Sequence, residues 1–467
     1  MLTEDERLLF DRVSVFAGGF DLASAEKVGG FDPIDDRDVI ELVSSLVDKS
    51  MIVADRGAMG MRYRLLETLR QYGEDQTELR GEIAMLRDRH AAHIADLFAE
   101  LGLFIRGPRL LEGSTKMALE WDNLRAAHLW SLAQGDLDLA ERLVVSSFEH
   151  AMFTMRQEHA SMVERTVELS DERDRPSTEI LGMLSFWLDI QGNEQESRRV
   201  AQRGIDAAPS PDHPSTAICW FEFAGATASF AAQSAEARSA FQHQAAAVEN
   251  MPDLDLHWPA LVYLTDASLH ADPSATPALR QRLSEMAARV RSPWLTMYAH
   301  QFEGHASVAA SQPDFNVAIT AYGRMAEIAH AVGDRQSQSL ALRGVAMAST
   351  GLGAPDALAH CHDALDALFE MRYWQKIRQT LQSVALALAN ADRTEHAAAV
   401  LGHLDCHAPA QGLEHSLQFC DRVRALVDAE GGHAAAMLRG AQMSPEELVT
   451  NALVWCSTDP ATLQQPS

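Results

Sequence analysis

Two short clusters of the chain hold side chains of the kind that bind transition metals. One is His360-Cys361-His362 and the other is His403-Leu404-Asp405-Cys406-His407, about one helical repeat further along. Stacked helices could bring His362 close to His403, with Cys361 or Cys406 as further ligands. Adjacent residues on an α-helix point about 100° apart, so at most two side chains of each cluster can converge. The pattern therefore favours a buried thiol flanked by exposed imidazoles over a metal site.

Other signatures of chemistry are equally weak. His90 and His93 lie three residues apart on an expected helix, but no further zinc ligand stands at suitable spacing, so we interpret both as packing or solvated side chains. The motifs Gly-x-Ser-x-Gly and His-Glu-x-x-His do not occur. Residues 351–356 begin like a dinucleotide-binding loop but follow no expected strand, which favours a turn between repeats. The sequence predicts no catalytic residue, no metal ligand and no cofactor, and hence a protein that is not an enzyme.

Nucleotide binding through a P-loop is also not expected. Such a loop needs a lysine directly after a glycine and before serine or threonine. The chain has only four lysines, Lys27, Lys49, Lys116 and Lys376, and none follows a glycine.

Eight tryptophans are spread at about one per expected helical pair. Aromatic side chains on the inner wall of a helical array can bind peptides, but core packing needs the same spacing, and we favour the core interpretation. The eight are Trp121, Trp130, Trp187, Trp220, Trp258, Trp294, Trp374 and Trp455.

Composition excludes further classes of function. The 467 residues include 66 Asp plus Glu against 39 Lys plus Arg, a net charge of −27, which disfavours binding to nucleic acid or to an anionic membrane. The five cysteines are few and scattered, as expected of thiols in a reducing cytosol. The N-terminus is acidic without an apolar core, and no apolar run is long enough for a membrane span. We therefore expect a folded cytoplasmic protein that does not bind membranes.

The first 75 residues have the pattern of three helices and a hairpin. Apolar residues at helical spacing occupy 8–16 and end at Gly18-Gly19, a second helix fits 22–28, and Asp35-Asp36 can cap a third helix with its apolar stripe over 39–47. Two short apolar runs, 51–54 and 61–66, flank a glycine-containing loop at 55–60. This order is typical of a winged helix.

A helical repeat follows. Residues 67–103 are helical in pattern without a strong breaker, and after them turn signals recur about every 40 residues, as in stacked helical hairpins. The turns lie at 135–136, 192–193, 233–234, 272–273, 312–313, 351–353 and 391–392. The best unit, 178–209, follows the tetratricopeptide spacing with Leu181, Leu184, Ser185, Leu188, Ser197, Ala201, Gly204 and Pro209. The unit around Gly135 repeats it with Leu124, Ala127, Ser131, Ala140 and Val144.

The predicted fold is thus mainly α, a winged-helix domain followed by an α-solenoid of tetratricopeptide-like helical hairpins. We place the winged helix at 1–75, connecting helices at 76–116, the solenoid at 117–455 and a C-terminal tail at 456–467.

Five blocks of sequence carry a resemblance to a known family. Residues 15–26, 42–50 and 62–73 resemble the winged helix of bacterial signal-transduction ATPases with numerous domains, the STAND ATPases. Residues 120–127 and 438–448 look like the helical repeats of the same family, specifically of LuxR-type or cyclase-linked predicted ATPases of actinobacteria. The resemblance covers nearly the whole chain.

The resemblance implies partners as well as a fold. Full family members carry a P-loop domain before the winged helix and often a DNA-reading helix-turn-helix after the repeats. We expect this chain to lack both, with the ATPase on another polypeptide or the chain left from a split or shortened gene. Related winged helices touch the nucleotide phosphate through a His-Asp pair, where this sequence has Leu66 and Glu67, so we expect no nucleotide contact there.

The third helix of the winged helix is acidic, which disfavours DNA. Asp32, Asp35, Asp36, Asp38, Glu41 and Asp48 stand around it against Arg37 and Lys49. We expect the non-catalytic sensing and docking part of a bacterial signalling or transcription regulator. Its solenoid would bind a protein or a small inducer, and its winged helix would pack on an ATPase domain in trans. The alternative is an autonomous DNA-binding transcriptional regulator that uses the winged helix.

Overall fold

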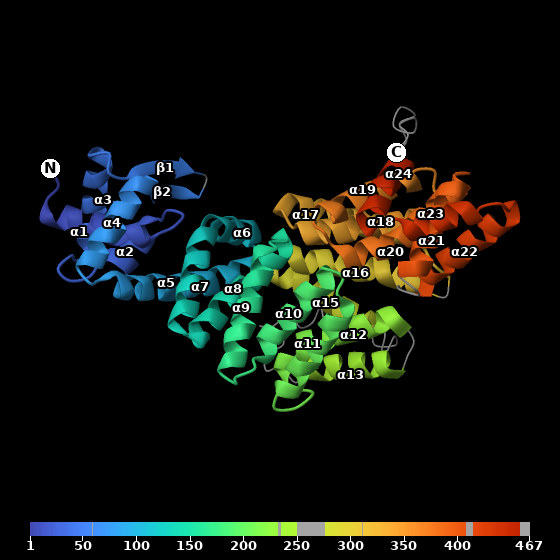
Figure 1. Ribbon diagram of the computed structural model, residues 1–467, viewed down its shortest axis with the longest axis horizontal. Helices are drawn as coiled ribbons and strands as arrows, with labels where there is room; N and C mark the ends of the chain where they lie inside the picture. Colours follow the sequence, from blue (N-terminus) through green and yellow to red (C-terminus); the bar gives the residue numbers. More distant parts are fainter. Residues whose placement is uncertain (58, 232–234, 250–275, 311, 408–413, 458–467) are drawn as a thin grey trace. The chain divides into compact units, whose positions relative to one another are not determined.

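The computed structural model describes the chain except residues 58, 232–234, 250–275, 311, 408–413 and 458–467. Its contacts divide the chain into two compact units, the first of residues 1–152 and 156–175 and the second of residues 153–155 and 176–467. Figure 1 shows helices in both units and one small hairpin near the N-terminus. None of the described helices is long and apolar enough to cross a bilayer.

The first unit begins with the predicted winged helix. Its helical elements are α1 (Glu4–Arg12), η1 (Val13–Val15), α2 (Leu22–Gly29), η2 (Asp36–Asp38) and α3 (Val39–Asp48). Thr3 and Glu6 form a capping box at the start of α1, and Asp21 caps α2. The apolar stripes that the sequence predicted meet in one core, which includes Leu9, Phe16, Val28, Val43 and Leu46.

A buried arginine closes the loop between α2 and η2. The Arg12 guanidinium donates hydrogen bonds to the carbonyls of Gly29 (3.1 Å), Phe31 (2.7 Å) and Asp32 (3.0 Å), and it lies over the Phe31 ring. The Gly29 and Phe31 carbonyls also accept backbone hydrogen bonds from Phe31 and Ile34, so Arg12 adds a second partner to each and holds the loop against α1.

The wing is a longer hairpin than predicted. Strands β1 (Val53–Gly57) and β2 (Gly60–Arg64) pair antiparallel, with Val53 opposite Arg64 and Gly57 opposite Gly60. Residues 55–57 and 60 were expected in the loop, but they belong to the strands, because glycines on either side of the turn allow the pairing to continue to its tip. Phe20 adds an isolated bridge to Tyr63, with two backbone hydrogen bonds of 2.8 Å.

Six further helices follow the wing and include the start of the repeats. They are α4 (Glu67–Leu79), α5 (Ile83–Arg106), α6 (Leu110–Leu119), α7 (Trp121–Gln134), α8 (Leu137–Thr154) and α9 (Glu158–Glu172). The expectation of unbroken helix over 67–103 was wrong. Gly81 follows the end of α4 in a left-handed conformation with φ +72°. A residue with a side chain adopts this conformation only with strain.

The second unit is an array of helices. Its described elements are α10 (Thr178–Ile190), α11 (Glu194–Ala207), η3 (Pro214–Thr216), α12 (Ala217–Ala231), α13 (Ala235–Glu249), α15 (Thr276–Val290), α16 (Pro293–Ala309), α17 (Phe315–Val332), α18 (Arg335–Leu352), α19 (Ala357–Glu370), α20 (Trp374–Asn390), α21 (Thr394–His407), α22 (Glu414–Glu430), α23 (Ala434–Gln442) and α24 (Pro445–Cys456). The predicted turns at 192–193, 312–313, 351–353 and 391–392 each separate two of them. Those at 233–234 and 272–273 lie outside the described residues.

The predicted turns fall at alternate junctions of the array. Residues 192–193 lie between α10 and α11, 312–313 between α16 and α17, 351–353 between α18 and α19, and 391–392 between α20 and α21. The junctions between them were not named from the sequence: Gly333, with φ +72°, joins α17 to α18, and Arg372, with φ +54°, lies between α19 and α20.

The pair α10–α11 confirms the tetratricopeptide spacing. Ser185 donates a hydrogen bond to the Ser197 carbonyl (2.8 Å), and a Cβ placed on Gly204 would come within 2.5 Å of the Cys219 sulfur. Small residues at these positions therefore let the helices approach closely. The corresponding positions of the Gly135 unit, from Leu124 to Val144, are buried as well.

A tyrosine of the array lies between two glycines. The Tyr322 ring of α17 passes between them, since a Cβ on Gly304 of α16 or Gly344 of α18 would lie 2.5 or 2.6 Å from ring atoms.

Candidate functional site

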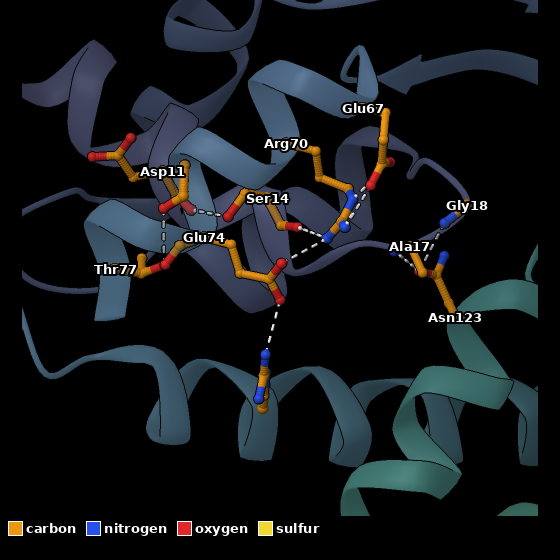
Figure 2. Close-up of polar contacts among 11 residues, drawn as sticks. Asp11, Ser14, Ala17, Gly18, Glu67, Arg70, Glu74, Thr77 and Asn123 are labelled. Carbon is orange, nitrogen blue, oxygen red and sulfur yellow. Dashed lines mark hydrogen bonds and ion pairs between the residues drawn. The ribbon is translucent and has the colours of Figure 1, made fainter. Parts of the chain in front are cut away.

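A fully buried asparagine ties the winged helix to the first helical repeat. The Asn123 side chain on α7 accepts a hydrogen bond from the Ala17 amide (2.8 Å) and donates one to the Gly19 carbonyl (2.8 Å). Figure 2 shows Asn123 facing Ala17 and Gly18 from the neighbouring helix. Asn123 also donates to Glu120 (2.6 Å) and lies 3.4 Å from the His90 Nε2. We call Asn123, Glu120 and their partners in the winged helix the interlock.

The wing joins the interlock through its second strand. Arg62 forms an ion pair with Glu120, and its guanidinium donates to the Leu119 carbonyl (3.3 Å). A Cβ on Gly19, whose φ is +90°, would lie 2.8 Å from the Tyr63 carbonyl oxygen, so the bridge requires glycine there. The sequence blocks 15–26, 62–73 and 120–127 therefore converge in one place.

Helix α4 connects the same region to α5 through charged side chains. Arg70 forms ion pairs with Glu67 (2.9 Å) and Glu74 (3.0 Å) and lies 3.4 Å from the Ser14 carbonyl, as Figure 2 shows. Glu74 in turn accepts a hydrogen bond from Arg87 of α5 (2.9 Å). Winged helix, α4 and α5 are thus linked by a continuous polar network.

The outer face of α3 presents no unpaired cation. Ile40 is 50% exposed, and Glu41, Ser44 and Asp48 are also exposed on this helix. The Lys49 ammonium lies 2.6 Å from the Glu6 carboxylate, and this hydrogen bond, with that from Ser45, lowers the pKa of Glu6 to about 2.

Arg37, the other cation near α3, is also engaged. It makes two hydrogen bonds to Asp35, of 3.0 and 2.8 Å. The surface that a DNA-reading winged helix would place in the groove is therefore apolar and acidic.

Comparison with known proteins identifies the N-terminal part. A family model described as "Winged helix-turn-helix domain" matches residues 2–77. Proteins named "Putative HTH-type transcriptional regulator" from Mycobacterium tuberculosis and Mycobacterium bovis are 38% identical to this chain over 149 residues. That stretch is 31% of this chain and only 16% of the relatives' length. An uncharacterized protein of M. tuberculosis is 35% identical over 95 residues, which are 20% of this chain and 24% of that protein.

A solved structure is similar to this chain over most of its length. It is a Signal Transduction ATPase with Numerous Domains (STAND) protein with a tetratricopeptide repeat sensor from Pyrococcus horikoshii. The TM-score is 0.50 at 12% sequence identity, over 98% of this chain and 66% of that chain. The likeness supports the fold, a winged helix followed by a solenoid of helical repeats.

The two histidine–cysteine clusters lie on α19 and α21, and α20 packs against both helices. Cys361 is buried, and burial raises the pKa of its thiol to about 12, while His360 and His362 are half-buried beside Asp356 and Asp363. In the second cluster His403 is buried and Cys406 is exposed, the reverse of the arrangement expected. Among the described residues no three His, Cys, Asp or Glu side chains are grouped to hold a metal ion.

The remaining sequence candidates have structural partners. His90 is buried, with its pKa lowered to about 4 by burial, and the His93 Nε2 lies 3.0 Å from the Ser24 hydroxyl. Leu66 precedes α4 and is exposed, while Glu67 pairs with Arg70.

Tryptophan burial follows the core interpretation in part. Trp121, Trp187, Trp220 and Trp294 are buried, which agrees with it, whereas Trp130, Trp374 and Trp455 are half-buried. Trp258 lies outside the described residues.

Sequence reasoning missed three further buried histidines of the first unit. They are His128 on α7, His150 on α8 and His159 on α9. Burial lowers their pKa values to about 4, 3 and 4. Each of these histidines has apolar residues at helical spacing around it in the sequence, and this pattern could have indicated that it is buried.

Proposed function

We propose that the chain is the non-catalytic sensing and docking part of a bacterial signalling or transcription regulator. Its helical array binds a protein or a small inducer, and its winged helix packs on an ATPase domain. The observation that carries the proposal is the outer face of α3, where an exposed isoleucine stands among acidic residues and the nearby cations are already paired. Such a surface suits a protein partner better than a phosphate backbone.

The interlock supplies the mechanical link for this function. Solenoid repeats contact mainly their neighbours, so a ligand that favours one curvature shifts the population of array conformations. Asn123 forms hydrogen bonds with the loop at 17–19, and Glu120 forms an ion pair with the second wing strand. A rotation of α7 is therefore transmitted to the winged helix. The ion pairs of Glu74 with Arg70 and Arg87 connect α4 to α5, so the two helices move together.

Partner capture tests the docking surface. The tagged full chain is expected to co-purify from its native cells with a P-loop ATPase identified by mass spectrometry. Replacing Ile40 by Asp should abolish this capture, because it places a charge in the apolar centre of the contact. The matched control is Leu103→Asp, which changes another exposed leucine-sized residue on α5 and should leave capture intact. Capture of no ATPase, or equal capture by both variants, would refute the docking role.

The second candidate is an autonomous DNA-binding regulator. It is favoured by the match to a winged helix-turn-helix model and by relatives named as HTH-type regulators. Fluorescence anisotropy with duplex DNA at about 50 mM salt separates the two, because phosphate contacts give strong binding at low salt that weakens as salt rises. We expect no binding. Salt-dependent retention of DNA that is lost on Arg37→Glu substitution would support the second candidate instead.

A further inference from the structure

The first unit contains a groove between the wing and α6. Its volume is about 370 Å³, which lies within the range of small-molecule sites. Gly57, Gly60 and Arg64 of the wing line one side of the groove, and Thr115 and Leu119 of α6 line the other. The surface of the groove is mostly apolar, although it lies between charged elements.

Two glycines that face each other across the hairpin form the floor of this groove. Gly57 is paired with Gly60, as Asp55 is with Arg62. Side chains alternate between the two faces of a strand, so Asp55, Arg62 and Arg64 lie on the same face of the hairpin as the two glycines. Charged side chains therefore stand beside a stretch of bare backbone.

The backbone conformation explains only one of the two glycines. Gly60 has φ +112°, a conformation that favours glycine. Gly57 has no positive φ, and a Cβ there would meet no described atom closer than the Gly60 carbonyl oxygen at 3.9 Å, its chain neighbours aside. Glycine inside a strand weakens the strand, and it often marks a place where a ligand approaches the backbone closely.

A guanidinium at the edge of the groove is accessible to a ligand. The Arg64 side chain is 52% exposed and donates through Nε to the Asp55 carboxylate (3.0 Å), its only hydrogen bond within the described part of the chain. An exposed ion pair of this kind contributes little to stability. The two terminal Nη groups remain for a carboxylate, which a guanidinium binds through two parallel hydrogen bonds.

Two further polar side chains of the groove are engaged within the fold. Arg62 forms an ion pair with Glu120 and donates to the Leu119 carbonyl (3.3 Å). The Thr115 hydroxyl donates to the Leu111 carbonyl (2.7 Å). Beside them lie the apolar side chains of Leu119, 40% exposed, and Met59, 39% exposed. The groove thus offers apolar surface next to one accessible guanidinium.

The groove also borders the interlock. Gly18, whose amide lies 3.4 Å from the Asn123 Oδ1, lines it together with Arg62 and Leu119. An occupant would therefore contact both the wing and α6 beside the ion pair that joins Arg62 to Glu120. Such a ligand favours the arrangement in which the winged helix and the first repeat are joined.

We propose that this groove binds a small amphiphilic carboxylate, whose apolar chain lies over Gly57 and against Leu119 and whose carboxylate binds the Nη groups of Arg64. A neutral or cationic molecule of the same shape lacks the charge that the guanidinium selects, and a short anion lacks the apolar contact. The inference goes beyond the proposed function, because it places a ligand at the junction of the winged helix with the repeats and not in the helical array.

Calorimetry of the full chain with octanoate, at concentrations up to about 5 mM, tests the site. Octanoate is expected to bind, to raise the unfolding temperature of the first unit and to slow hydrogen exchange at the Gly18 amide. 1-Octanol and octylammonium should bind at least about 10-fold more weakly, because neither carries a carboxylate that accepts charged hydrogen bonds from the guanidinium. Acetate, which lacks the apolar chain, should not bind.

Substitutions then locate the ligand. Arg64→Met should weaken octanoate binding by about 10- to 100-fold, the loss expected for charged hydrogen bonds, and Gly57→Leu should abolish binding by filling the floor of the groove. The control for the first is Arg56→Met, which removes the same charge from the opposite face of the hairpin. The control for the second is Gly102→Leu, which adds the same side chain in open space on α5. Both controls should bind octanoate as the wild type does.

Three results would overturn the inference. They are no binding of octanoate by the wild type, binding of 1-octanol or octylammonium as tight as that of octanoate, and undiminished binding by folded Arg64→Met and Gly57→Leu chains. Circular dichroism establishes folding, and Arg64→Met alone decides the test if Gly57→Leu does not fold. Partner capture is measured separately, so a chain that captures its ATPase but binds no octanoate retains the docking function and loses only this site.

Discussion

At the scale of single residues, Asn123 links the loop at 17–19 of the winged helix to α7. It is fully buried, and its amide group serves the backbone of the loop at 17–19 as well as Glu120. A buried backbone group that loses its partner carries the full cost of its desolvation. The geometry of the loop therefore depends on one side chain that belongs to another element.

Removing this amide should loosen the loop. Asn123→Ala removes the hydrogen bond to the buried Gly19 carbonyl and frees the Ala17 amide, which belongs to an exposed residue and can bind water, so we expect the first unit to lose about 1 to 3 kcal/mol of stability. Hydrogen exchange should show loss of protection at Ala17. Arg125→Ala on the same helix removes only exposed ion pairs with Asp122 and Glu158 and should cost under about 1 kcal/mol. Unchanged exchange at Ala17 in the first variant would contradict the interlock.

At the scale of elements, glycines set how closely helices pack. A Cβ on Gly73 of α4 would lie 2.8 Å from the Ser14 Cβ and 3.3 Å from the Asp11 Cα, so α4 can lie against α1 and η1 only with glycine there. Gly102 on α5 has open space around its Cβ position. Two glycines inside helices thus have opposite roles.

The same substitution should therefore have opposite effects. Gly73→Ala is expected to destabilise the first unit by about 1 to 3 kcal/mol through the steric clash. Gly102→Ala should stabilise it by up to about 1 kcal/mol, because alanine restricts the unfolded chain and favours the helix. Urea unfolding of both variants measures the difference. Equal effects of the two would show that α4 is free to shift.

At the scale of the whole molecule, the large burial shifts of groups that titrate between pH 3 and 7 fall on histidines in the first unit and on carboxyls in the second, although burial also raises the pKa values of Asp11 and Glu149 in the first unit. The first unit holds His90, His128, His150 and His159 with pKa values lowered by burial to between about 3 and 4. The second holds Asp189 and Asp334, whose pKa values burial raises to about 6 and about 7, and Glu222, whose pKa burial raises well above its usual value. Their stabilities should therefore respond to pH in opposite directions.

The sign follows from proton binding. For the histidines the unfolded chain binds more protons, so stability is complete above pH 6.5 and is lost as pH falls toward 4, at up to about 3 kcal/mol per histidine. For the carboxyls the folded chain binds more protons, so stability is greatest near pH 4 and declines as pH rises toward 7. Calorimetry at pH 7 and 4.5 should show the first transition moving down and the second moving up. His128→Gln should reduce the shift of the first, and parallel shifts of both transitions would refute the assignment.

The local features of the fold could be predicted, and the long-range contacts could not. The cap at Asp35, which the structure places on η2 just before α3, the apolar stripe of α3 and the glycines of the wing act over a few residues, so the sequence pattern contains them. Asn123 contacts Ala17 across 106 positions, and Gln375 contacts Asp189 across 186. Such pairings depend on how successive helices stack, which periodicity does not specify. The blocks 15–26, 62–73 and 120–127 were therefore visible as separate motifs, but their meeting was not.

The threading of Tyr322 between Gly304 and Gly344 has an evolutionary consequence. These positions lie on three successive helices, and a larger residue at either glycine would leave no room for the phenol ring. Substitution at one position alone would be selected against, so the three should change together among descendants of a common ancestor. Lineages that keep tyrosine should keep both glycines, and lineages that have gained alanine or serine at a glycine should carry a smaller side chain at the tyrosine position.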